Sequence, residues 1–251
     1  MRVAIAQPTY LPWSGHFDLI DQVDRHVVLD NVQFEKQSWQ QRNRIKGGAG
    51  LQWLTVPVEF RGRLGQTIRE VQIRDASFAR DHLRAIELAY RRAHFFEEYY
   101  PALTTHLQSA RAGSLLFELN FELLRWFLNT LGIATPLVLA SQLPVEGKRT
   151  ELLAAICRHL GADRYLSPPG SAVYLLNEMG TLSQAGVDVS FQHYVPPEYT
   201  QRFPPFVPYA SALDLIFNEG PRSLEILRRG RREPFTPDQM AARLVELQVR
   251  S

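Results

Sequence analysis

The pattern of apolar and polar positions predicts short buried strands that alternate with amphipathic helices. Residues 3–6 and 27–29 are short apolar runs, and residues 16–23 between them carry apolar side chains at spacings of three and four. Two further strands are predicted at 136–140 and 164–166, and a third at 187–191. Strands separated by helices favour a mainly parallel sheet that is covered on both faces. The predicted fold is therefore α/β, with three layers in a Rossmann-like arrangement.

Longer helices are predicted in the middle and at the end of the chain. Pro101 is expected to interrupt the first of them, and Gly132 is well placed to end the second. Thr150 is expected to cap the third helix, which a glycine at position 161 would end. The predicted helices span residues 78–100, 115–131, 150–160, 210–217 and 237–249.

A small antiparallel insertion is predicted at about residues 51–73. Residues 51–60 alternate and are rich in Trp, Val and Thr, and Pro57 places this strand near an edge or an end. Residues 68–73 are expected to form the strand that pairs with it. The preceding segment, 38–45, is too polar for a buried element and is expected to lie outside the sheet.

Polar residues follow the first two predicted strands. Gln7 comes directly after the first strand, and Asp30 follows the second. Gln33 comes soon after Asp30 and would face the same side as Asp30 if the second strand continues. Loops at the carboxyl ends of parallel strands are where ligands usually bind in open α/β sheets. We therefore predict the active region there.

Composition indicates an ordinary globular chain of 251 residues, expected to form one domain, 1–251, with a helical extension at about 222–251. The formal charge of +2 gives no indication of general nucleic-acid binding. Cys157 is the single cysteine, so an internal disulfide is excluded, and its place on an apolar stripe predicts a packed, unreactive thiol. No segment has the pattern of a signal peptide or a membrane helix, which predicts a cytoplasmic protein without membrane insertion.

Two residues are candidates for the catalytic base. His16 stands at a predicted helix start, and an unperturbed pKa of about 6.5 would leave it mostly neutral at pH 7. Its alternative is a histidine that caps the helix or faces solvent. Asp30 stands where α/β folds often hold a ribose, a metal or a base, and its alternative is a turn-forming aspartate. The other histidines sit singly, so no zinc site is predicted.

A basic and aromatic run follows the second strand. Guanidinium groups bind carboxylate or phosphate in a two-pronged fashion, and an indole can stack on a sugar or a base. Arg42 and Arg44 are therefore candidate anion clamps, and Tyr10, Trp13 and Trp39 are candidate walls. On a helix, Trp39 would share a face with residue 43, and the alternative is a solvated basic helix with one anchoring tryptophan. The predicted binding residues of this run are Lys36, Trp39, Arg42, Asn43 and Arg44.

Two later segments offer further polar groups. Ser167, Gly170 and Ser171 follow a predicted strand and could donate hydrogen bonds to an anionic ligand, although a plain turn explains them equally well. Asp214 and Asn218 stand four residues apart on a predicted helix and can point together. A contact on the helix surface is the simpler explanation of that pair.

The chain resembles the WbqC-like proteins of bacterial surface-polysaccharide, or O-antigen, gene clusters. The resemblance rests on AIAQPTYLPWSGHFDLI, LDNVQFEKQSWQQRNRIK and LTVPV, and later on GADRYLSPPGSAVYL and FVPYASALDLIFNEGP, which together reach to about Pro221. In the family pattern an aromatic residue often follows the glycine, where this chain has His16. The resemblance implies a glycine or other aminoacyl transferase that acts on an amino sugar.

Two alternatives to a transferase remain open. The register Trp13, Ser14, Gly15 and His16 faintly resembles the first signature of HIGH-type nucleotidylyltransferases, although the first histidine is missing. In that class the glycine lets a helix N-terminus approach the nucleotide. A non-catalytic protein that binds a sugar nucleotide is the other alternative. The expected partner is a small molecule, either a sugar nucleotide or a carrier-bound aminoacyl donor, and the residues identify no cofactor.

Overall fold

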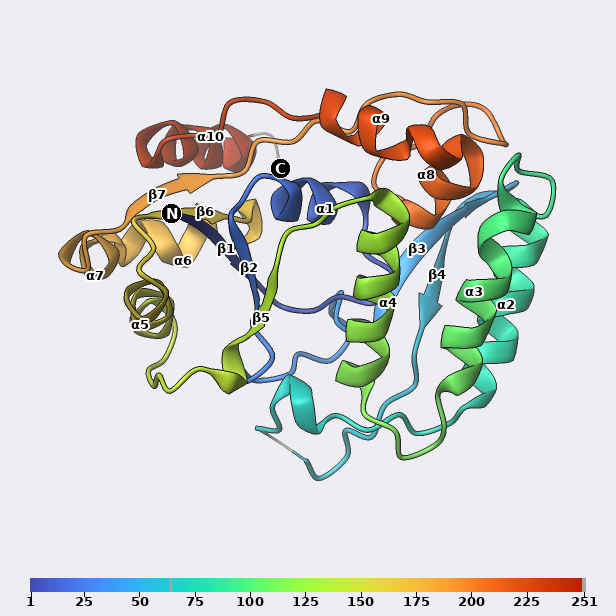
Figure 1. The fold of residues 1–251 in the computed structure, drawn as a ribbon, viewed down its shortest axis with the longest axis horizontal. Helices are drawn as coiled ribbons and strands as arrows, with labels where there is room; N and C mark the ends of the chain where they lie inside the picture. Colours follow the sequence, from blue (N-terminus) through green and yellow to red (C-terminus); the bar gives the residue numbers. More distant parts are fainter. Residues whose placement is uncertain (64, 250–251) are drawn as a thin grey trace.

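A five-stranded parallel sheet forms the centre of the computed structural model, which describes residues 1–63 and 65–249. The strand order is β5-β2-β1-β6-β7, and every neighbouring pair is parallel. The strands lie side by side in Figure 1, with β1 in the middle. Their bounds are Arg2–Ala6 (β1), Arg25–Val28 (β2), Leu137–Leu139 (β5), Arg164–Ser167 (β6) and Asp188–Phe191 (β7).

Helices cover both faces of the sheet. Val3 and Ile5 of β1 pack in one apolar cluster with α5, α6 and α7, whereas Ala4 between them packs with Leu19 of α1. This alternation follows from the two-residue period of a strand. The α-helices are α1 Ser14–Asp21, α2 Ser77–Tyr90, α3 Phe96–Ser109, α4 Leu116–Leu131, α5 Thr150–Leu160, α6 Ala172–Asn177, α7 Met179–Gln184, α8 Ala212–Glu219, α9 Ser223–Arg229 and α10 Pro237–Val249. The predicted three-layer α/β fold is confirmed.

The C-terminal helices complete the cover. Helix α8 packs against α3 and the hairpin, α9 packs against α1, and α10 packs against α6 and β7. Figure 1 shows these helices along one edge of the molecule, with α5, α6 and α7 on one side of the sheet and α2, α3 and α4 on the other side of the view. Within the described residues, no helix is long and apolar enough to cross a membrane.

The antiparallel hairpin lies earlier in the chain than the sequence pattern predicts. It consists of β3 (Arg42–Gly47) and β4 (Gly50–Thr55), and Asn43 and Ile45 of β3 are buried, so the prediction that 38–45 is too polar for a buried element is wrong. Its buried polar residues have partners: Asn43 donates to the Tyr10 carbonyl, and the Lys46 ammonium donates to Gln201 and to two loop carbonyls. Ile68–Glu70, predicted as a strand, is a 3-10 helix (η1).

Two details of the helices differ from the predictions. Pro101 lies inside α3, and the predicted single helix instead breaks at residues 91–95, where the Phe95 amide donates to the Phe217 carbonyl of α8. Thr150 is the first residue of α5 rather than its cap, because its hydroxyl donates to Glu178. The predicted glycine ends are confirmed, since the caps of α4 and α5, Gly132 and Gly161, are both left-handed.

Candidate functional site

A cavity of about 860 Å³ opens at the carboxyl ends of β1 and β2. Gln7 follows β1, Asn31 and Gln33 follow β2, and Tyr174 contributes from α6. This is the edge of a parallel sheet at which α/β proteins usually bind ligands. We call it the strand-end cavity, and its lining residues are Gln7, Leu29, Asn31, Val32, Gln33, Glu35, Val145, Glu146, Gly147, Lys148, Arg149, Leu152, Leu153 and Tyr174.

A tight turn ahead of α5 forms one wall of the strand-end cavity. Gly147 has φ +141°, and a Cβ atom there would lie 2.9 Å from the backbone nitrogen of Leu152, so no L side chain fits without a shift. Arg149 also has a positive φ, +52°, which is strained for a residue with a side chain. An ion pair to Glu178 at 2.8 Å holds Arg149 in place, and its guanidinium lies 5.4 Å from the centre of the Tyr174 ring.

A second cavity, of about 290 Å³, lies beside the first turn of α1. The Trp13 ring forms its base and packs 5.4 Å from Tyr209. It also covers Gly15 so closely that a Cβ atom at position 15 would lie 2.2 Å from the indole. We call this site the indole cavity, and its lining residues are Thr9, Trp13, His16, Trp39, Asn43, Arg44 and Tyr209.

His16 lines the indole cavity with a neutral imidazole. Its Nε2 atom is buried and has no hydrogen-bond partner among the described residues. Burial lowers the pKa of His16 to about 4, so the ring is uncharged at pH 7. The ring of His26, on β2, lies 5.7 Å away, is fully buried, and has no partner for either nitrogen in the part of the chain that the structure describes. A neutral His16 can accept or donate a hydrogen bond, but its low pKa makes it a weak base at neutral pH.

The arginines of β3 stack on two tryptophans. The Arg44 guanidinium lies 5.5 Å from the centre of Trp39 and 5.3 Å from Trp53, and the Arg42 guanidinium lies 4.4 Å from Trp53. Arg44 reaches the indole cavity, and its buried Nε atom has no hydrogen-bond partner within residues 1–63 and 65–249. Arg42 lines neither cavity. These residues were predicted on a helix, and the structure places Arg42 to Arg44 on a strand instead.

The two cavities are neighbours that share chain segments. Gln7 lines the strand-end cavity and Thr9 lines the indole cavity, and their Cα atoms are within about 7 Å because only one residue separates them. The Gln40 side chain donates to Gln7 at 2.8 Å, while the adjacent Trp39 lines the indole cavity. The two cavities are therefore lined by adjoining stretches of the same segments.

Asp30 lines neither cavity. Its carboxylate is fully buried and accepts hydrogen bonds from the backbone and the hydroxyl of Ser141, at 2.9 and 2.7 Å. It also lies 3.3 Å from the Arg69 guanidinium. These contacts tie the end of β2 to the segment after β5 and to η1. Gln7 and His16 line different cavities, and Asp30 and Arg42 line neither. These predicted site residues therefore do not share one hollow, and the geometry gives Asp30 a positioning role.

Replacing Asp30 by Asn separates a positioning role from a role as a base. We expect Asp30→Asn to lower the free energy of unfolding by about 2 kcal/mol, because an amide cannot accept both Ser141 hydrogen bonds and keep its ion pair. Urea denaturation of the ligand-free chain measures this loss. A variant as stable as the wild type would contradict the positioning role.

Several predicted binding residues lie outside both cavities. Tyr10 is fully buried, and its hydroxyl forms a 2.8 Å hydrogen bond with His82. Lys36 is exposed and lies over the Phe60 ring. The Ser167 and Ser171 hydroxyls bond to each other at 2.6 Å. These three sets of side chains therefore already have partners within the protein. Gly170, the remaining residue of that loop, also lines neither cavity.

Asp214 belongs to a buried network rather than to a cavity. Its carboxylate accepts hydrogen bonds from Tyr199 at 2.6 Å and from Gln201 at 2.8 Å. Burial raises the pKa of Asp214, and these hydrogen bonds oppose that effect. The side chain of Asn218 donates to the Asp214 backbone carbonyl, so the two side chains do not point together into a cleft. The network anchors the loop that carries Tyr209.

Sequence reasoning missed two parts of the site. The prediction from the sequence does not include the turn at 145–149. A glycine followed by Lys148 and Arg149 ahead of a helix is nevertheless a pattern typical of anion-binding turns. Tyr209 gives no such sign, because only the fold brings it to Trp13. Cys157 is buried as predicted, and burial raises its pKa to about 12. Among the described residues, no group of three His, Cys, Asp or Glu side chains could hold a metal ion.

Comparison with known proteins identifies the family of the chain. The model of the WbqC-like protein family matches residues 7–226. The chain is also 37% identical over 229 residues to the uncharacterized protein Rv1507c of Mycobacterium tuberculosis, covering 90% of this chain and 97% of that protein. No solved structure matches the chain significantly. The family match covers most of the sequence, including both cavities, and the chain therefore belongs to the WbqC-like protein family.

Proposed function

We propose that this chain is a transferase that moves an aminoacyl, glycyl-type, or acyl group onto an amino sugar in polysaccharide or natural-product biosynthesis. The observation that carries the proposal is the indole cavity. It gathers five residues that the sequence had marked as candidates, namely Trp13, His16, Trp39, Asn43 and Arg44. Its volume is near the lower limit of about 300 Å³ for small-molecule sites, which suits a single sugar ring.

The side chains of the indole cavity match the needs of amide formation. The amine nitrogen of the sugar would attack the carbonyl carbon of the acyl donor, and the bond from that carbon to the leaving group would break with its electron pair. His16 lines the cavity with a neutral ring, which supports a role in orienting the neutral amine. The Arg44 guanidinium lines the cavity as well, which supports a role in stabilising the charge that develops on the carbonyl oxygen. The amine proton leaves to solvent or to the departing group.

The neighbouring strand-end cavity leaves room for the rest of a substrate. A carrier-bound donor and a nucleotide-linked acceptor each exceed one ring in size, and the two cavities share the segment from Gln7 to Thr9. Arg44 and His16 would then lie at the reacting end of the site, and the strand-end cavity would hold a part of the substrate that does not react. This division supports a group transfer between two bound molecules.

A transfer assay tests the proposal. The purified chain is incubated with free and nucleotide-linked amino sugars together with a glycyl thioester, glycyl-tRNA, or glycine with ATP, and products are followed by mass spectrometry. We expect the addition of one glycyl or acyl group to the sugar. Arg44→Gln should slow transfer about a hundredfold, because it removes a charged donor to the carbonyl oxygen. Arg42→Gln on the same strand is the matched control and should retain transfer, since Arg42 lines neither cavity.

Two outcomes would reject the proposed activity. Release of pyrophosphate from ATP without any modified sugar would indicate nucleotidylyl transfer. Tight binding of amino-sugar nucleotides with no product from any of the three donor classes would indicate a binding protein. Equal loss of activity in Arg44→Gln and Arg42→Gln would contradict the specific role of Arg44, because the two residues share the same strand and the same tryptophan contact.

A further inference from the structure

We propose that the strand-end cavity binds the diphosphate and ribose of a nucleoside diphosphate, with the phosphates at residues 147–149 and the ribose at Asn31 and Glu35. This inference extends the proposed function, because it assigns a place to the nucleotide part of a substrate. It is tested by binding alone and does not need turnover.

The cationic side of the cavity has free hydrogen-bond donors. The Lys148 side chain lines the cavity and makes no ion pair or hydrogen bond within the described part of the chain. Leu152, in the first turn of α5, also lines the cavity, and its backbone amide donates to no backbone carbonyl among the described residues. This amide stands at the positive end of α5, an eleven-residue helix. A phosphate group would pair with Lys148 at this positive end of the helix.

Gly147 lets the turn pack closely against the start of α5. A Cβ atom at Gly147 would lie 2.9 Å from the backbone nitrogen of Leu152, so the close approach that places Lys148 and Arg149 at the cavity needs glycine here. Arg149 adds a second cation, a guanidinium that an ion pair to Glu178 and the Tyr174 ring hold beside the cavity. A diphosphate has two charged groups and fits two neighbouring cations better than a single carboxylate does.

The segment after β2 brings acceptors to the cavity. The Oδ1 atom of Asn31 is buried and has no donor within the described residues. A buried acceptor without a partner is costly, and a ribose hydroxyl would satisfy it. Glu35 on this segment and Glu146 beside Lys148 are exposed at the cavity and carry negative charge, which opposes a free inorganic anion. The same carboxylates accept hydrogen bonds from hydroxyl groups, so the lining favours a ligand that carries hydroxyls as well as phosphates.

The volume agrees with this ligand. Cavities for ligands of drug or cofactor size measure about 300 to 1,000 Å³. The strand-end cavity, at about 860 Å³, is near the upper end of this range and exceeds what a lone phosphate would need. Two kinds of substrate contain a nucleoside diphosphate. One is an acceptor that is a sugar nucleotide, and the other is an acyl donor that carries an adenosine diphosphate group.

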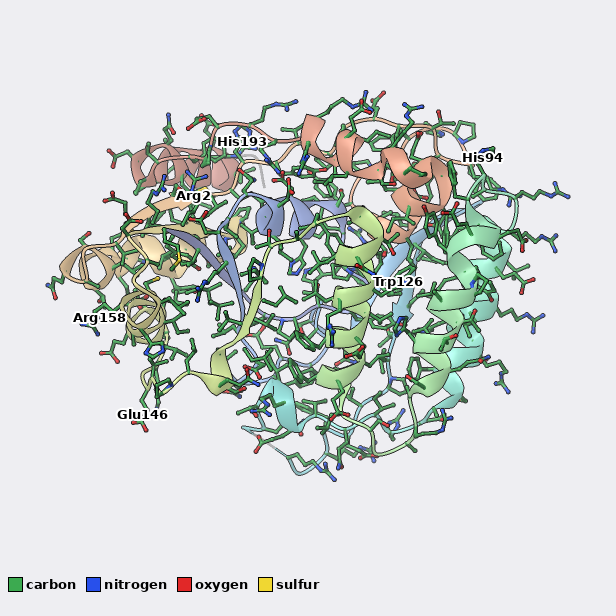
Figure 2. The ribbon with its side chains drawn as sticks, in the orientation of Figure 1. Arg2, His94, Trp126, Glu146, Arg158 and His193 are labelled. Atoms are coloured by element: carbon green, nitrogen blue, oxygen red, sulfur yellow. The ribbon has the colours of Figure 1, made fainter. Side chains whose placement is uncertain are left out.

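Calorimetric titration of the full chain with UDP, GDP, ADP and inorganic pyrophosphate tests the inference. We expect at least one nucleoside diphosphate to bind more tightly than pyrophosphate. Lys148→Ala should weaken that binding by about tenfold or more, as expected for the loss of a charged hydrogen bond. Arg158→Ala is the matched control, because Arg158 is an exposed cation near the other end of α5 and does not line the cavity. Figure 2 marks Arg158 on the helix and Glu146 on the loop ahead of it.

A second variant tests the ribose side. Asn31→Ala should weaken the binding of the nucleoside diphosphate and leave pyrophosphate binding unchanged. Preference for UDP or GDP would identify the sugar nucleotide as the source, and preference for ADP would identify the acyl donor. The inference is overturned if no nucleoside diphosphate binds at millimolar concentration. It is also overturned if Lys148→Ala and Arg158→Ala bind equally well, or if pyrophosphate binds as tightly as every nucleotide.

The outcome is independent of the transfer assay. Binding that depends on Lys148, in a chain that transfers no acyl group, would keep this inference and reject the proposed function. Transfer onto a free amino sugar, with no binding of any nucleoside diphosphate, would keep the proposed function and reject this inference.

Discussion

Lowering the pH from 7 to 5 is expected to reduce the free energy of unfolding by about 4 kcal/mol through His16 and His82 alone. Burial lowers the pKa of each of these side chains to about 4. In the unfolded chain a histidine has a pKa of about 6.5. The unfolded state therefore binds more protons than the folded state between these two values, and stability must fall as the pH falls through this window. Each histidine contributes about 2 kcal/mol over the two pH units.

Other buried groups add to the pH dependence of stability, with either sign. Burial lowers the pKa of His26 well below its ordinary value, and a nearby His16 lowers it further, so His26 adds to the loss. Burial raises the pKa of the Asp18 and Asp214 carboxyls, which has the opposite sign because these groups take up protons in the folded chain first. The measured change in the free energy of unfolding with pH is the sum of these contributions, and a histidine variant isolates the contribution of one side chain.

Urea denaturation at several pH values between 5 and 7 measures the slope. His82→Gln should reduce it by about 1 kcal/mol per pH unit between pH 5 and 6, while the amide can still bond to the Tyr10 hydroxyl. His159→Gln is the control, because His159 is exposed on α5 and its loss should leave the slope unchanged. A free energy of unfolding that stays constant from pH 7 to pH 5 would contradict the expectation.

The sequence predicts the central sheet well, because its determinants are local. Apolar runs of three to five residues mark β1, β2 and β5, and their flanking helices have a regular spacing of apolar positions. Gly132 and Gly161 end α4 and α5 because the left-handed conformation that ends a helix is easily adopted by glycine. No distant contact is needed for these features.

The hairpin could not be predicted because its burial depends on distant partners. Lys46 is buried on β3, and its ammonium donates to Gln201, which is 155 residues away in the chain. Asn43 is buried through its contact with Tyr10. A pattern of polar residues indicates exposure unless these partners are known.

The candidate site was predicted only in part, for a similar reason. Gln7 and Gln33 follow β1 and β2, so their place at the strand-end cavity follows from the rule for parallel sheets. The turn that carries Lys148 reaches the same cavity because β5 pairs with β2, although more than 100 residues separate these strands. Local sequence does not fix strand order, and this contribution therefore needed the structure.

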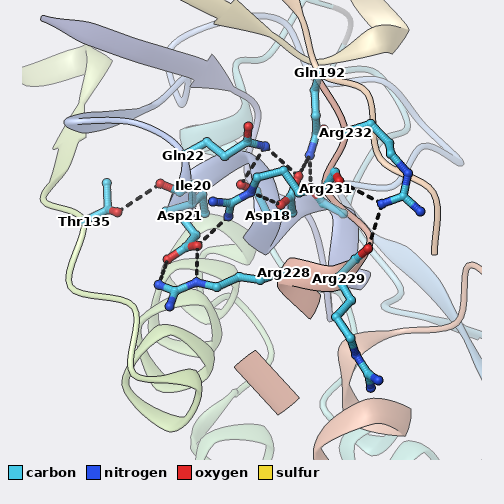
Figure 3. A network of polar contacts seen from close by, with 11 residues as sticks. Asp18, Ile20, Asp21, Gln22, Thr135, Gln192, Arg228, Arg229, Arg231 and Arg232 are labelled. Carbon is cyan, nitrogen blue, oxygen red and sulfur yellow. Dashed lines mark hydrogen bonds and ion pairs between the residues drawn. The ribbon is translucent and has the colours of Figure 1, made fainter. Parts of the chain in front are cut away.

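Replacing Arg231 by Met is expected to lower the free energy of unfolding by about 3 kcal/mol. Figure 3 shows the network that this change would break. The Asp18 carboxylate is fully buried and accepts hydrogen bonds from Arg231 at 2.9 Å and from Gln192 and Gln22 at 2.7 Å each. Removing one partner of a buried ion pair leaves an unpaired buried charge, which costs about 3 to 5 kcal/mol. Thermal unfolding should then occur roughly 6 to 12 °C lower.

Arg228→Met is the matched control. Arg228 forms two hydrogen bonds of 2.8 Å with Asp21, but its side chain is 52% exposed, and such pairs contribute about 1 kcal/mol or less. Equal destabilisation by the two variants would show that the burial of Asp18 has no special effect. Lower pH should reduce the difference between them, because protonation removes the unpaired charge that Arg231→Met leaves on Asp18.

The same network connects stability to the candidate site. The Gln192 amide donates to the Asp18 carboxylate and also to the Gly15 carbonyl, at 2.7 and 2.8 Å. Gly15 is covered by the Trp13 ring of the indole cavity. Arg231→Met should therefore also reduce the rate of transfer at temperatures at which the variant is still folded. The reason is that Gln192 would have to follow a displaced Asp18 and would release the first turn of α1. Unchanged transfer by the folded variant would show that α1 is held without this contact.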